Sequence, residues 1–429
     1  MASVAGLSGD IAGFTTALRA AWTVGPTPAA PAPPVQQAVV FPASPPMGDF
    51  SGFFSFRGFN TGTGLDLNAF RQLDFGDLNS LAVFASRLPL RFARPDATGE
   101  VRTGGSDIGR EEAETAAILS AAPRIVEAFG PDAVAIELRG EIYDVVRRYD
   151  DPVSGFYAVQ LHPRDGGAEI FAIDGLEVGS RADQVASATL ARLQVQSAAF
   201  RAMVADADSY AISTRGEVLV TGASLGGAVA EVAAYEIAEG LVATRLPFTT
   251  GVVQLVTVDA LGGRDAAEAI NGGRLLPAPL RLIEALNLRD EGDIVSRIGS
   301  HIGATVTFPT YDENGRRVVL DAEDAHVNVV SLLQVLESDA LFAQGVRGAP
   351  AEISGFAAAS KAVSPALIAA YLASGERDPT TPTKLQIPGE ASFDATRTIY
   401  SLDADSDGDT DLSVFLARPA PPSLDPFVL

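Results

Sequence analysis

The segment Val218–Ala230 places a serine between two glycines in a G-x-S-x-G pattern, formed by Gly222, Ser224 and Gly226. A run of apolar and β-branched residues precedes the pattern, and a run rich in alanine and valine follows it. This order predicts a strand, a tight turn and a helix, the setting in which a serine hydroxyl projects from a sheet as a nucleophile. The backbone N–H of Leu225, in the first turn of that helix, is predicted to face a developing oxyanion.

These residues resemble the nucleophile turn of the α/β-hydrolases, and more closely that of the class 3 lipases, which usually reads G-H-S-L-G-G. Here Ala223 stands where that histidine is usual. Upstream, residues 155–175 are similar to the hairpin that carries the F-R-G-T segment of the family, with Asp174 and Leu176 in place of Arg and of Thr or Ser. The resemblance covers about residues 154–337. It implies an α/β-hydrolase fold, ester hydrolysis through a Ser-His-Asp triad, and the backbone N–H of Leu176 as the second oxyanion donor.

A serine nucleophile requires a general base, normally a histidine, and a carboxylate that orients the base. The chain contains three histidines, His162, His301 and His326. In α/β-hydrolases the acid and then the histidine follow the serine, and His326 precedes an apolar helical run where such a fold presents its base. We therefore expect His326 to be the base, with His301 as the alternative. His162 precedes the serine in a turn-like segment, so we expect a solvated side chain there.

Two segments offer the carboxylate. Asp259 follows the predicted strand 252–258, and Asp293 follows the next predicted strand. The segment that begins at Asp293 resembles the D-x-V-P segment of the class 3 lipases, with Ser296 in place of proline. The resemblance therefore implies that Asp293 is the acid, with Asp290 as a local alternative, and we expect Asp259 to shape the loop above the sheet.

The elements that must position these residues follow from hydrophobic patterning. The predicted strands are 156–161, 168–173, 217–221, 252–258 and 280–286, and the predicted helices are 111–129, 131–148, 181–207, 226–237, 351–361 and 365–374. Strands that alternate with helices predict an α/β protein with a mostly parallel central sheet flanked by helices.

The chain is expected to have three parts. Residues 1–150 form an N-terminal extension with a Pro- and Ala-rich linker at 24–46 and helices that pack on the core. Residues 151–347 form the hydrolase core, and residues 348–429 form a C-terminal extension. The Phe-rich segment 50–75 and the segment 261–279 are candidates for a lid or a pocket wall.

An acidic segment near the C-terminus has the spacing of calcium ligands. Carboxylates fall at positions 1, 3, 5 and 9 of a calcium loop and a glycine at position 6, but Val414 occupies position 12, which is a glutamate in EF-hands. Converging carboxylates repel each other without a cation. We therefore expect a structural calcium ion, with a solvated acidic turn as the alternative, and no cofactor for catalysis. The candidate ligands are Asp403, Asp405, Asp407, Asp409 and Asp411.

Composition narrows the classes of partner. The 429 residues include 54 acidic and 31 basic side chains, so the formal net charge is −23, and there is no cysteine. Such a chain does not hold nucleic acid by general electrostatics, and it forms neither disulfides nor thiolate sites. No apolar run reaches about 18 residues, the length of a membrane span. No secretory signal is visible, so we expect a secreted protein whose export uses no cleaved N-terminal signal, or otherwise a cytoplasmic one.

The expected function is therefore serine ester hydrolysis of lipase or esterase type on a small-molecule or lipid ester. Two alternatives stay open. One is a catalytically inactive, calcium-dependent binding or surface protein on a hydrolase fold, suggested by the altered residues Ala223 and Leu176. The other is peptide or thioester hydrolysis by the same three residues, because a triad alone does not select the acyl group.

Overall fold

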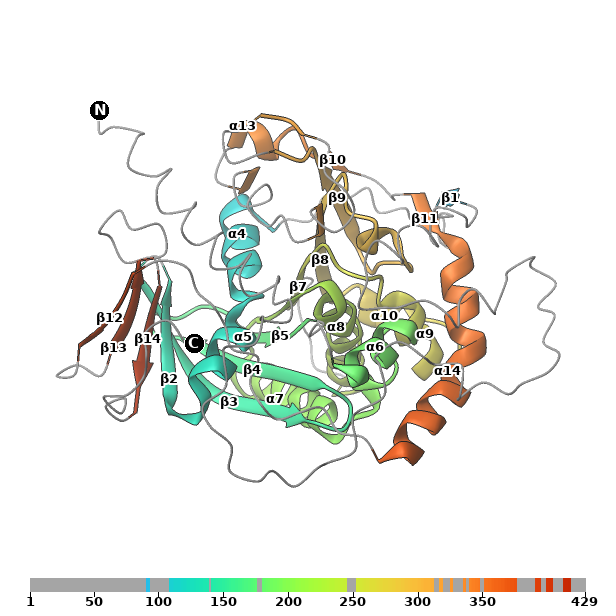
Figure 1. The fold of residues 1–429 in the computed structure, drawn as a ribbon, viewed down its shortest axis with the longest axis horizontal. Coiled ribbons are helices and arrows are strands. Elements are labelled where there is room, and N and C mark those ends of the chain that lie inside the picture. The colour runs from blue at the N-terminus through green and yellow to red at the C-terminus, as the bar shows by residue number, and fades with distance from the viewer. Residues whose placement is uncertain are drawn as a thin grey trace, which may run out of the picture.

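The structure is a computed structural model, and it describes residues 90–92, 108–138, 140–175, 180–244, 252–311, 316–318, 325–326, 335–336, 339–347, 351–375, 390–394, 399–403 and 412–417. Within these residues the chain forms one sheet of 12 strands and a separate pair of strands, with helices on both faces of the large sheet (Figure 1).

The large sheet is mixed. In spatial order its strands are β10 (Val346–Arg347), β9 (Ala304–Phe308), β8 (Ile283–Asp290), β7 (Val253–Val258), β6 (Val218–Ala223), β5 (Glu169–Ile173), β4 (Phe156–Pro163), β3 (Glu141–Asp151), β2 (Ala133–Leu138), β14 (Leu412–Leu416), β13 (Ile399–Asp403) and β12 (Glu390–Asp394). The run from β5 to β9 is parallel, and the strands on either side of it join antiparallel. The small pair consists of β1 (Leu90–Phe92) and β11 (Ala351–Ile353).

Helices connect and cover these strands. They are α4 (Arg110–Leu119), α5 (Ala122–Phe129), α6 (Arg181–Ala188), α7 (Ala198–Thr214), α8 (Ser224–Thr244), α9 (Arg264–Ile270), α10 (Pro277–Leu280), α13 (Asp339–Phe342) and α14 (Ser354–Ser374), with 3-10 turns η2 (Gly130–Asp132), η3 (Gln194–Gln196) and η4 (Val295–Arg297). The parallel strands and the helices between them form the α/β-hydrolase fold expected from the sequence.

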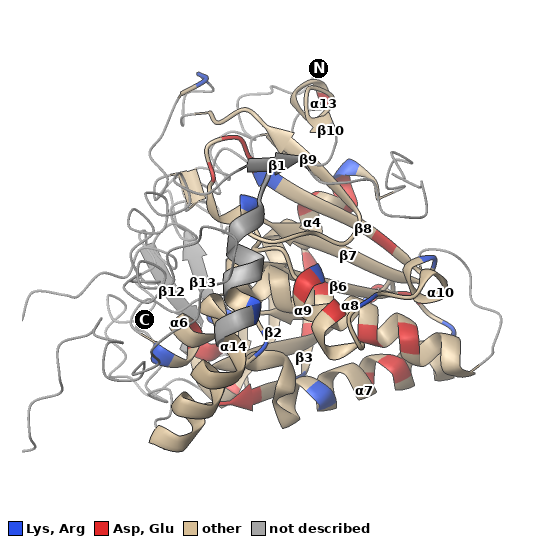
Figure 2. Ribbon diagram, turned by 90° about the vertical axis from the view of Figure 1, so that its right-hand side faces the viewer, with Lys and Arg blue, Asp and Glu red and all other residues tan. Residues whose placement is uncertain are grey.

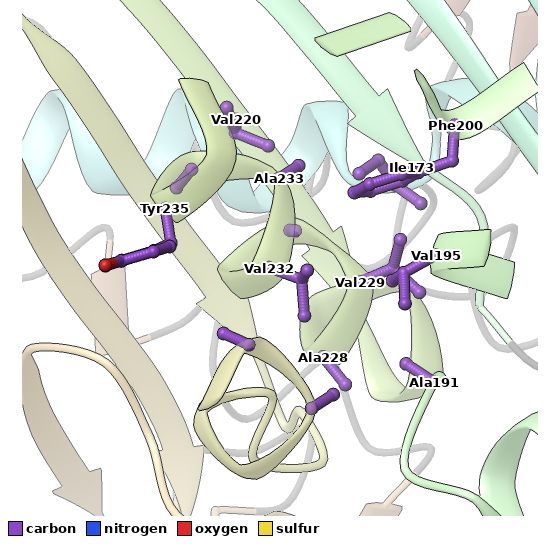
Figure 3. Packing of buried hydrophobic residues seen from close by; sticks show 14 of the residues in the cluster. Ile173, Ala191, Val195, Phe200, Val220, Ala228, Val229, Val232, Ala233 and Tyr235 are labelled. Carbon is purple, nitrogen blue, oxygen red and sulfur yellow. The ribbon is translucent and has the colours of Figure 1, made fainter. Parts of the chain in front are cut away.

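Two apolar clusters fill the two faces of the sheet. Successive side chains of a strand point to opposite faces, so Val218 and Val220 of β6 belong to one cluster and Leu219 to the other. The first cluster is covered by α6, α7, α8, α9 and α14, and Figure 3 shows its side chains from β5, β6, α7 and α8. The second is covered by α4 and α5. Thr221 also donates a hydrogen bond of 2.8 Å to the carbonyl of Ala116 in α4.

Helix α8 lies at the centre of this arrangement. It packs on β6 and β7 and is covered on its outer side by α7, α9 and α10. Its alanine- and valine-rich sequence is accordingly buried over most of its length. Figure 2 shows that charged residues recur along the outer helix α7, whereas β6 and β7 carry none. A buried central helix is what fixes the position of the serine at its first residue.

The prediction of a helix at 131–148 is wrong, because this segment forms β2 and β3, which pair antiparallel. Gly140 joins the two strands with a φ of +82°, a left-handed conformation that suits a tight turn and ends a helix. The segment is also rich in valine and isoleucine, which favour strands when neighbouring strands are there to pair with them. Pairing with β14 and β4 decides the structure here.

Other helix predictions have different boundaries. The single helix predicted at 111–129 is divided into α4 and α5. The single helix predicted at 181–207 is divided into α6 and α7, because Leu190 and Ala191 have left-handed φ values of 49° and 66° that interrupt it. Conversely, residues 354–361 of the first predicted piece and all of the second, 365–374, lie in the one helix α14, which contains Pro365. Residues 351–353 of the first piece form β11 instead.

The predicted division into three parts stays a prediction. Strands β2 and β3 from the first part and β12–β14 from the last belong to the same sheet as the central part. The linker at 24–46 and the segment 50–75 lie outside the described residues. In the segment 261–279, α9 and α10 pack on α8, and the Tyr235 hydroxyl accepts a hydrogen bond of 2.8 Å from the N–H of Leu276.

Candidate active site

The turn between β6 and α8 holds Ser224 in an unusual backbone conformation. Ser224 has a φ of +53°, in the left-handed region that residues with a Cβ seldom adopt. Around it the backbones lie too close for side chains: a Cβ on Gly222 would lie 2.6 Å from the carbonyl of Gly226, and a Cβ on Gly226 would collide with the carbonyl of Asp174. The glycines of the pattern are therefore required by close packing of β5, β6 and α8 at this turn.

Ser224 faces the histidine that the sequence favours as the base. Its Oγ lies 2.9 Å from Nε2 of His326, and Nδ1 of His326 lies 3.0 Å from Oδ1 of Asp293. The three residues are 7%, 4% and 0% exposed, respectively. The structure thus brings together the three residues predicted as a triad, in one hydrogen-bonded series shielded from water. In such surroundings electrostatic interactions are stronger than in water.

The backbone that follows Asp293 fixes its carboxylate. Oδ1 accepts a hydrogen bond of 2.9 Å from the N–H of Val295, and Oδ2 accepts one of 2.9 Å from the N–H of Ser296. Burial alone would raise the pKa of Asp293, but the facing His326 and the hydrogen bonds from Ser296 lower the pKa below its ordinary value. A proline at position 296 would lack this N–H. The departure from the D-x-V-P segment therefore supplies a hydrogen-bond donor to the carboxylate.

The other acid candidates are engaged in the loops. Oδ1 of Asp259 accepts a hydrogen bond of 2.8 Å from the N–H of Asp290, and Asp259 has a φ of +42°. Burial, together with the nearby carboxylates of Asp293 and Asp290, raises the pKa of Asp259 well above its ordinary value. Asp290 accepts hydrogen bonds from the N–H of Gly292 and the hydroxyl of Thr310. Asp293 is the candidate that lies beside His326.

The other two histidines contact carboxylates away from Ser224. His162 lies in β4 with a half-exposed side chain, and its Nδ1 is 2.8 Å from Oε2 of Glu169. His301 is buried: its Nδ1 is 2.6 Å from Oε1 of Glu231, and its Nε2 is 2.9 Å from the carbonyl oxygen of Ser296.

Glu231 is a buried residue beside the site that sequence reasoning missed. The signal was present, because Glu231 is a carboxylate within the apolar run of α8, seven residues after Ser224. Seven residues are nearly two helical turns, which places both residues on almost the same side of α8.

Of the two residues expected to donate to the oxyanion, the structure describes Leu225. Leu225 lies in the first turn of α8 and is fully buried. Leu176 lies outside the described residues, but the residue before it reaches the site: a Cβ on Gly175 would lie 3.7 Å from Cβ of Ser224. Asp174, which replaces the usual arginine, pairs with Arg124 at 2.8 Å. The chain that leaves β5 therefore passes directly beside the serine.

The acidic segment near the C-terminus connects β13 and β14, which pair antiparallel. Of its five aspartates only Asp403, the last residue of β13, lies within the described residues, and the other four lie outside them. Val414, at position 12 of the loop pattern, pairs with Tyr400 in the sheet and is fully buried. In the described part of the chain, no group of three or more His, Asp or Glu side chains is placed to hold a metal ion.

No protein-family model and no curated protein matches the chain. Solved structures of lipases do match. A triacylglycerol lipase from Penicillium expansum is 13% identical, and the match spans 53% of this chain and 96% of that one with a TM-score of 0.35. Lip2 lipase from Yarrowia lipolytica is also 13% identical (48% and 82% of the two chains, TM-score 0.31). Rhizomucor miehei lipase in a propeptide complex is 14% identical (56% and 79%, TM-score 0.32).

Helices long and apolar enough to cross a membrane are not found among the described residues.

Proposed function

We propose that the protein is a serine ester hydrolase of lipase or esterase type that acts on a small-molecule or lipid ester. One observation carries the proposal. Oγ of Ser224, at a strained turn between β6 and α8, lies 2.9 Å from Nε2 of His326, and Nδ1 of the same ring lies 3.0 Å from Oδ1 of Asp293. Nucleophile, base and orienting acid in this order are the arrangement that acyl transfer requires.

The first half-reaction makes an acyl-enzyme. Oγ of Ser224 attacks the ester carbonyl carbon while Nε2 of His326 takes the hydroxyl proton, and the carbonyl oxygen becomes an oxyanion. The backbone N–H groups of Leu225 and Leu176 are the proposed donors to that oxyanion. When the intermediate collapses, the C–O bond to the alcohol breaks and His326 returns the proton to the departing alkoxide.

The second half-reaction repeats the chemistry with water. His326 takes a proton from water, the resulting hydroxide attacks the acyl carbon, and Ser224 leaves with the proton returned. Asp293 holds the ring with its Nδ1–H directed at the carboxylate and stabilises the imidazolium in both halves. Because the hydrogen bonds and His326 lower the pKa of Asp293, it stays ionised at neutral pH and can do this.

The proposal is tested by turnover of soluble nitrophenyl esters of graded chain length by the full chain. We expect wild-type turnover and, in Ser224→Ala, a loss of about four orders of magnitude or more in kcat. Equal turnover by the two proteins would reject Ser224. A folded wild-type protein that hydrolyses no ester, thioester or peptide would instead favour the inactive binding protein. A preference for thioesters or peptides would replace the ester by that class as the proposed substrate.

We also propose a structural calcium ion bound by the segment from Asp403 to Asp411. The support is the ligand spacing in the sequence, together with the antiparallel strands that bring the two ends of the segment together. Calcium should raise the melting temperature of the wild-type protein, and this rise should be much smaller in Asp405→Asn/Asp407→Asn. The same rise in both proteins would contradict the site.

A further inference from the structure

A second buried acid–histidine pair lies beside the first. Glu231 extends from α8, and its side chain is fully buried. Its Oε1 lies 2.6 Å from Nδ1 of His301, and its Oε2 accepts hydrogen bonds from the N–H groups of Ile302 at 2.8 Å and Gly263 at 3.2 Å. A buried carboxylate is costly unless it is paired and hydrogen-bonded, and both oxygens here have partners.

His301 extends this contact to the loop of Asp293. Its Nε2 lies 2.9 Å from the carbonyl oxygen of Ser296, and the N–H of the same Ser296 donates to Oδ2 of Asp293 at 2.9 Å. The two pairs therefore form a ring of contacts that begins and ends on α8. In order, its members are Ser224, His326, Asp293, Ser296, His301 and Glu231.

The protonation of His301 follows from its two neighbours. A carbonyl oxygen only accepts hydrogen bonds, so Nε2 must carry a proton. Nδ1 faces the carboxyl group of Glu231. Burial raises the pKa of Glu231 above its ordinary value, against His301 and the N–H groups of Ile302 and Gly263, which favour its charged form. One proton lies between Nδ1 and Oε1 in either charge state of the pair, so the Nε2–H bond to Ser296 is kept in both. Burial would lower the pKa of His301, but Glu231 and the carbonyl of Ser296 raise the pKa above its ordinary value.

The backbone between these loops is joined at the same place. The N–H of Leu261 donates to the carbonyl of Ser224 at 3.1 Å, and the N–H of Gly262 donates to the carbonyl of Ile298 at 2.8 Å. The chain after β7 is thus hydrogen-bonded to α8, and the chain after β8 is hydrogen-bonded to the chain after β7. Glu231 contacts both segments, through Gly263 and through His301.

We propose that Glu231 and His301 are positioning residues for the hydrolytic site. They hold the Ser296 turn, which is η4 (Val295–Arg297), and through it the carboxylate of Asp293, at a fixed place relative to the helix that carries Ser224. The proposal rests on the proposed ester hydrolase function. Stability alone is a weak reason for a buried ion pair, since apolar residues of similar size often stabilise as well. The position of this pair, between the nucleophile helix and the acid loop, gives it an effect on the reaction.

The test compares two variants that differ only at His301. In Glu231→Gln, the amide can accept the two backbone N–H bonds and donate to a neutral His301, whose Nε2–H still reaches Ser296. In Glu231→Gln/His301→Leu, the buried charge is equally absent but the bond to Ser296 is lost. His162→Gln, at a half-exposed ring, serves as the surface control.

Displacing the carboxylate of Asp293 reduces the stabilisation of the transition state more than it reduces substrate binding. We expect Glu231→Gln to keep more than about a third of the wild-type kcat, and the double variant to lose about 10- to 100-fold in kcat with KM changed less than about threefold. If the double variant does not fold, Glu231→Gln/His301→Asn carries the same comparison, because asparagine is too short to span the two partners.

A second readout does not depend on activity. The chain contains three histidines, so NMR spectra of the ¹⁵N-labelled protein contain imidazole signals from three rings. We expect the His326 Nδ1 proton to be sharp and far downfield in the wild type and in Glu231→Gln, and to broaden or move upfield in the double variant.

The outcomes separate the two proposals. An unchanged kcat and an unchanged His326 signal in a folded double variant would overturn the positioning role. So would a loss confined to the melting temperature. A wild-type protein without any hydrolytic activity whose His326 signal still responds to His301 would reject the function but keep the positioning.

Discussion

Two buried acid–histidine pairs lie on either side of the Ser296 turn, and they resemble each other closely. Asp293 and His326 are 3.0 Å apart, Glu231 and His301 are 2.6 Å apart, and both carboxylates are fully buried. Both carboxylates also accept two hydrogen bonds from backbone N–H groups. An acid, a histidine and burial therefore do not by themselves define a catalytic pair.

The difference lies at the outer nitrogen of each ring. Nε2 of His326 faces the hydroxyl of Ser224, which can give up a proton, whereas Nε2 of His301 faces the carbonyl oxygen of Ser296, which cannot. The first ring is therefore placed to accept a proton from the hydroxyl, whereas the second donates a hydrogen bond to the carbonyl oxygen. We infer that the group facing the second ring nitrogen decides whether such a pair performs chemistry or holds a loop.

The largest expected difference between the pairs is at the histidines. His326→Ala removes the base, and we expect kcat for ester hydrolysis to fall by about 10⁴- to 10⁶-fold. His301→Ala should cost no more than about 100-fold, because the base and the nucleophile both remain. Steady-state kinetics on one soluble ester, with His162→Gln as the control, checks both values. Equal losses at His301 and His326 would break the comparison.

Substitutions of the two carboxylates should reduce kcat unequally in the same direction, with the larger loss at Asp293. Asp293→Asn keeps the shape of the side chain but favours the wrong tautomer of His326, and we expect a loss of about 10⁴-fold in kcat. Glu231→Gln keeps its hydrogen bonds to the loop and should lose only a few-fold. If Glu231→Gln proved as damaging as Asp293→Asn, the roles of the two carboxylates would have to be exchanged.

The stability effect should be clearest at Glu231. Glu231→Ala leaves His301 buried without its counter-ion and two backbone N–H groups without an acceptor, so we expect the free energy of unfolding to fall by about 3–5 kcal/mol. Glu231→Gln should lose less than half of this. Denaturant unfolding of the three proteins measures the difference. Losses of the same size in both variants would show that the charge, rather than the hydrogen bonds, is what the loop requires.

The smallest expected effect is the pH dependence of stability contributed by His301. Because Glu231 and Ser296 raise its pKa in the folded protein, against burial and the nearby charge of Arg289, the folded state binds the proton more tightly than the unfolded state. This stabilisation is full below about pH 6.5, the ordinary value for histidine, and is lost as pH rises through the raised pKa.

The measurement is the melting temperature of the wild type minus that of His301→Leu, followed across this pH range. A difference that grows with rising pH would contradict the sign. Asp293 has the opposite dependence, because its lowered pKa gives stability that is present above about pH 4 and lost as pH falls through the folded pKa.

Much of the central fold could be predicted from the sequence, because there local and long-range preferences agree. The strand before Ser224 is apolar and β-branched, the helix after it is rich in alanine, and the glycines mark the close approach of β5 and α8. His326 was predicted from its place after the serine and before an apolar helical run, and Asp293 from the resemblance of its segment to that of the class 3 lipases. The structure places both beside Ser224.

The features that could not be predicted depend on partners that are distant in the sequence. The segment 131–148 forms strands because β14, more than 250 residues later, and β4 pair with it. The role of His301 could not be read locally either, since its two partners, Glu231 and Ser296, come from α8 and η4. A glutamate within the apolar first half of α8 was the signal available for this pair, and it does not by itself name a partner.

We propose that Ser224 is an activated nucleophile and that His326, not His301, activates it. The direct measurement is the rate of labelling of the full chain by a fluorophosphonate, with the modified residue identified by peptide mapping. We expect labelling at Ser224 in the wild type, labelling in His301→Leu that is slower but still at Ser224, and almost none in His326→Ala. A folded wild-type protein that does not label, or that labels at another residue, would contradict this proposal.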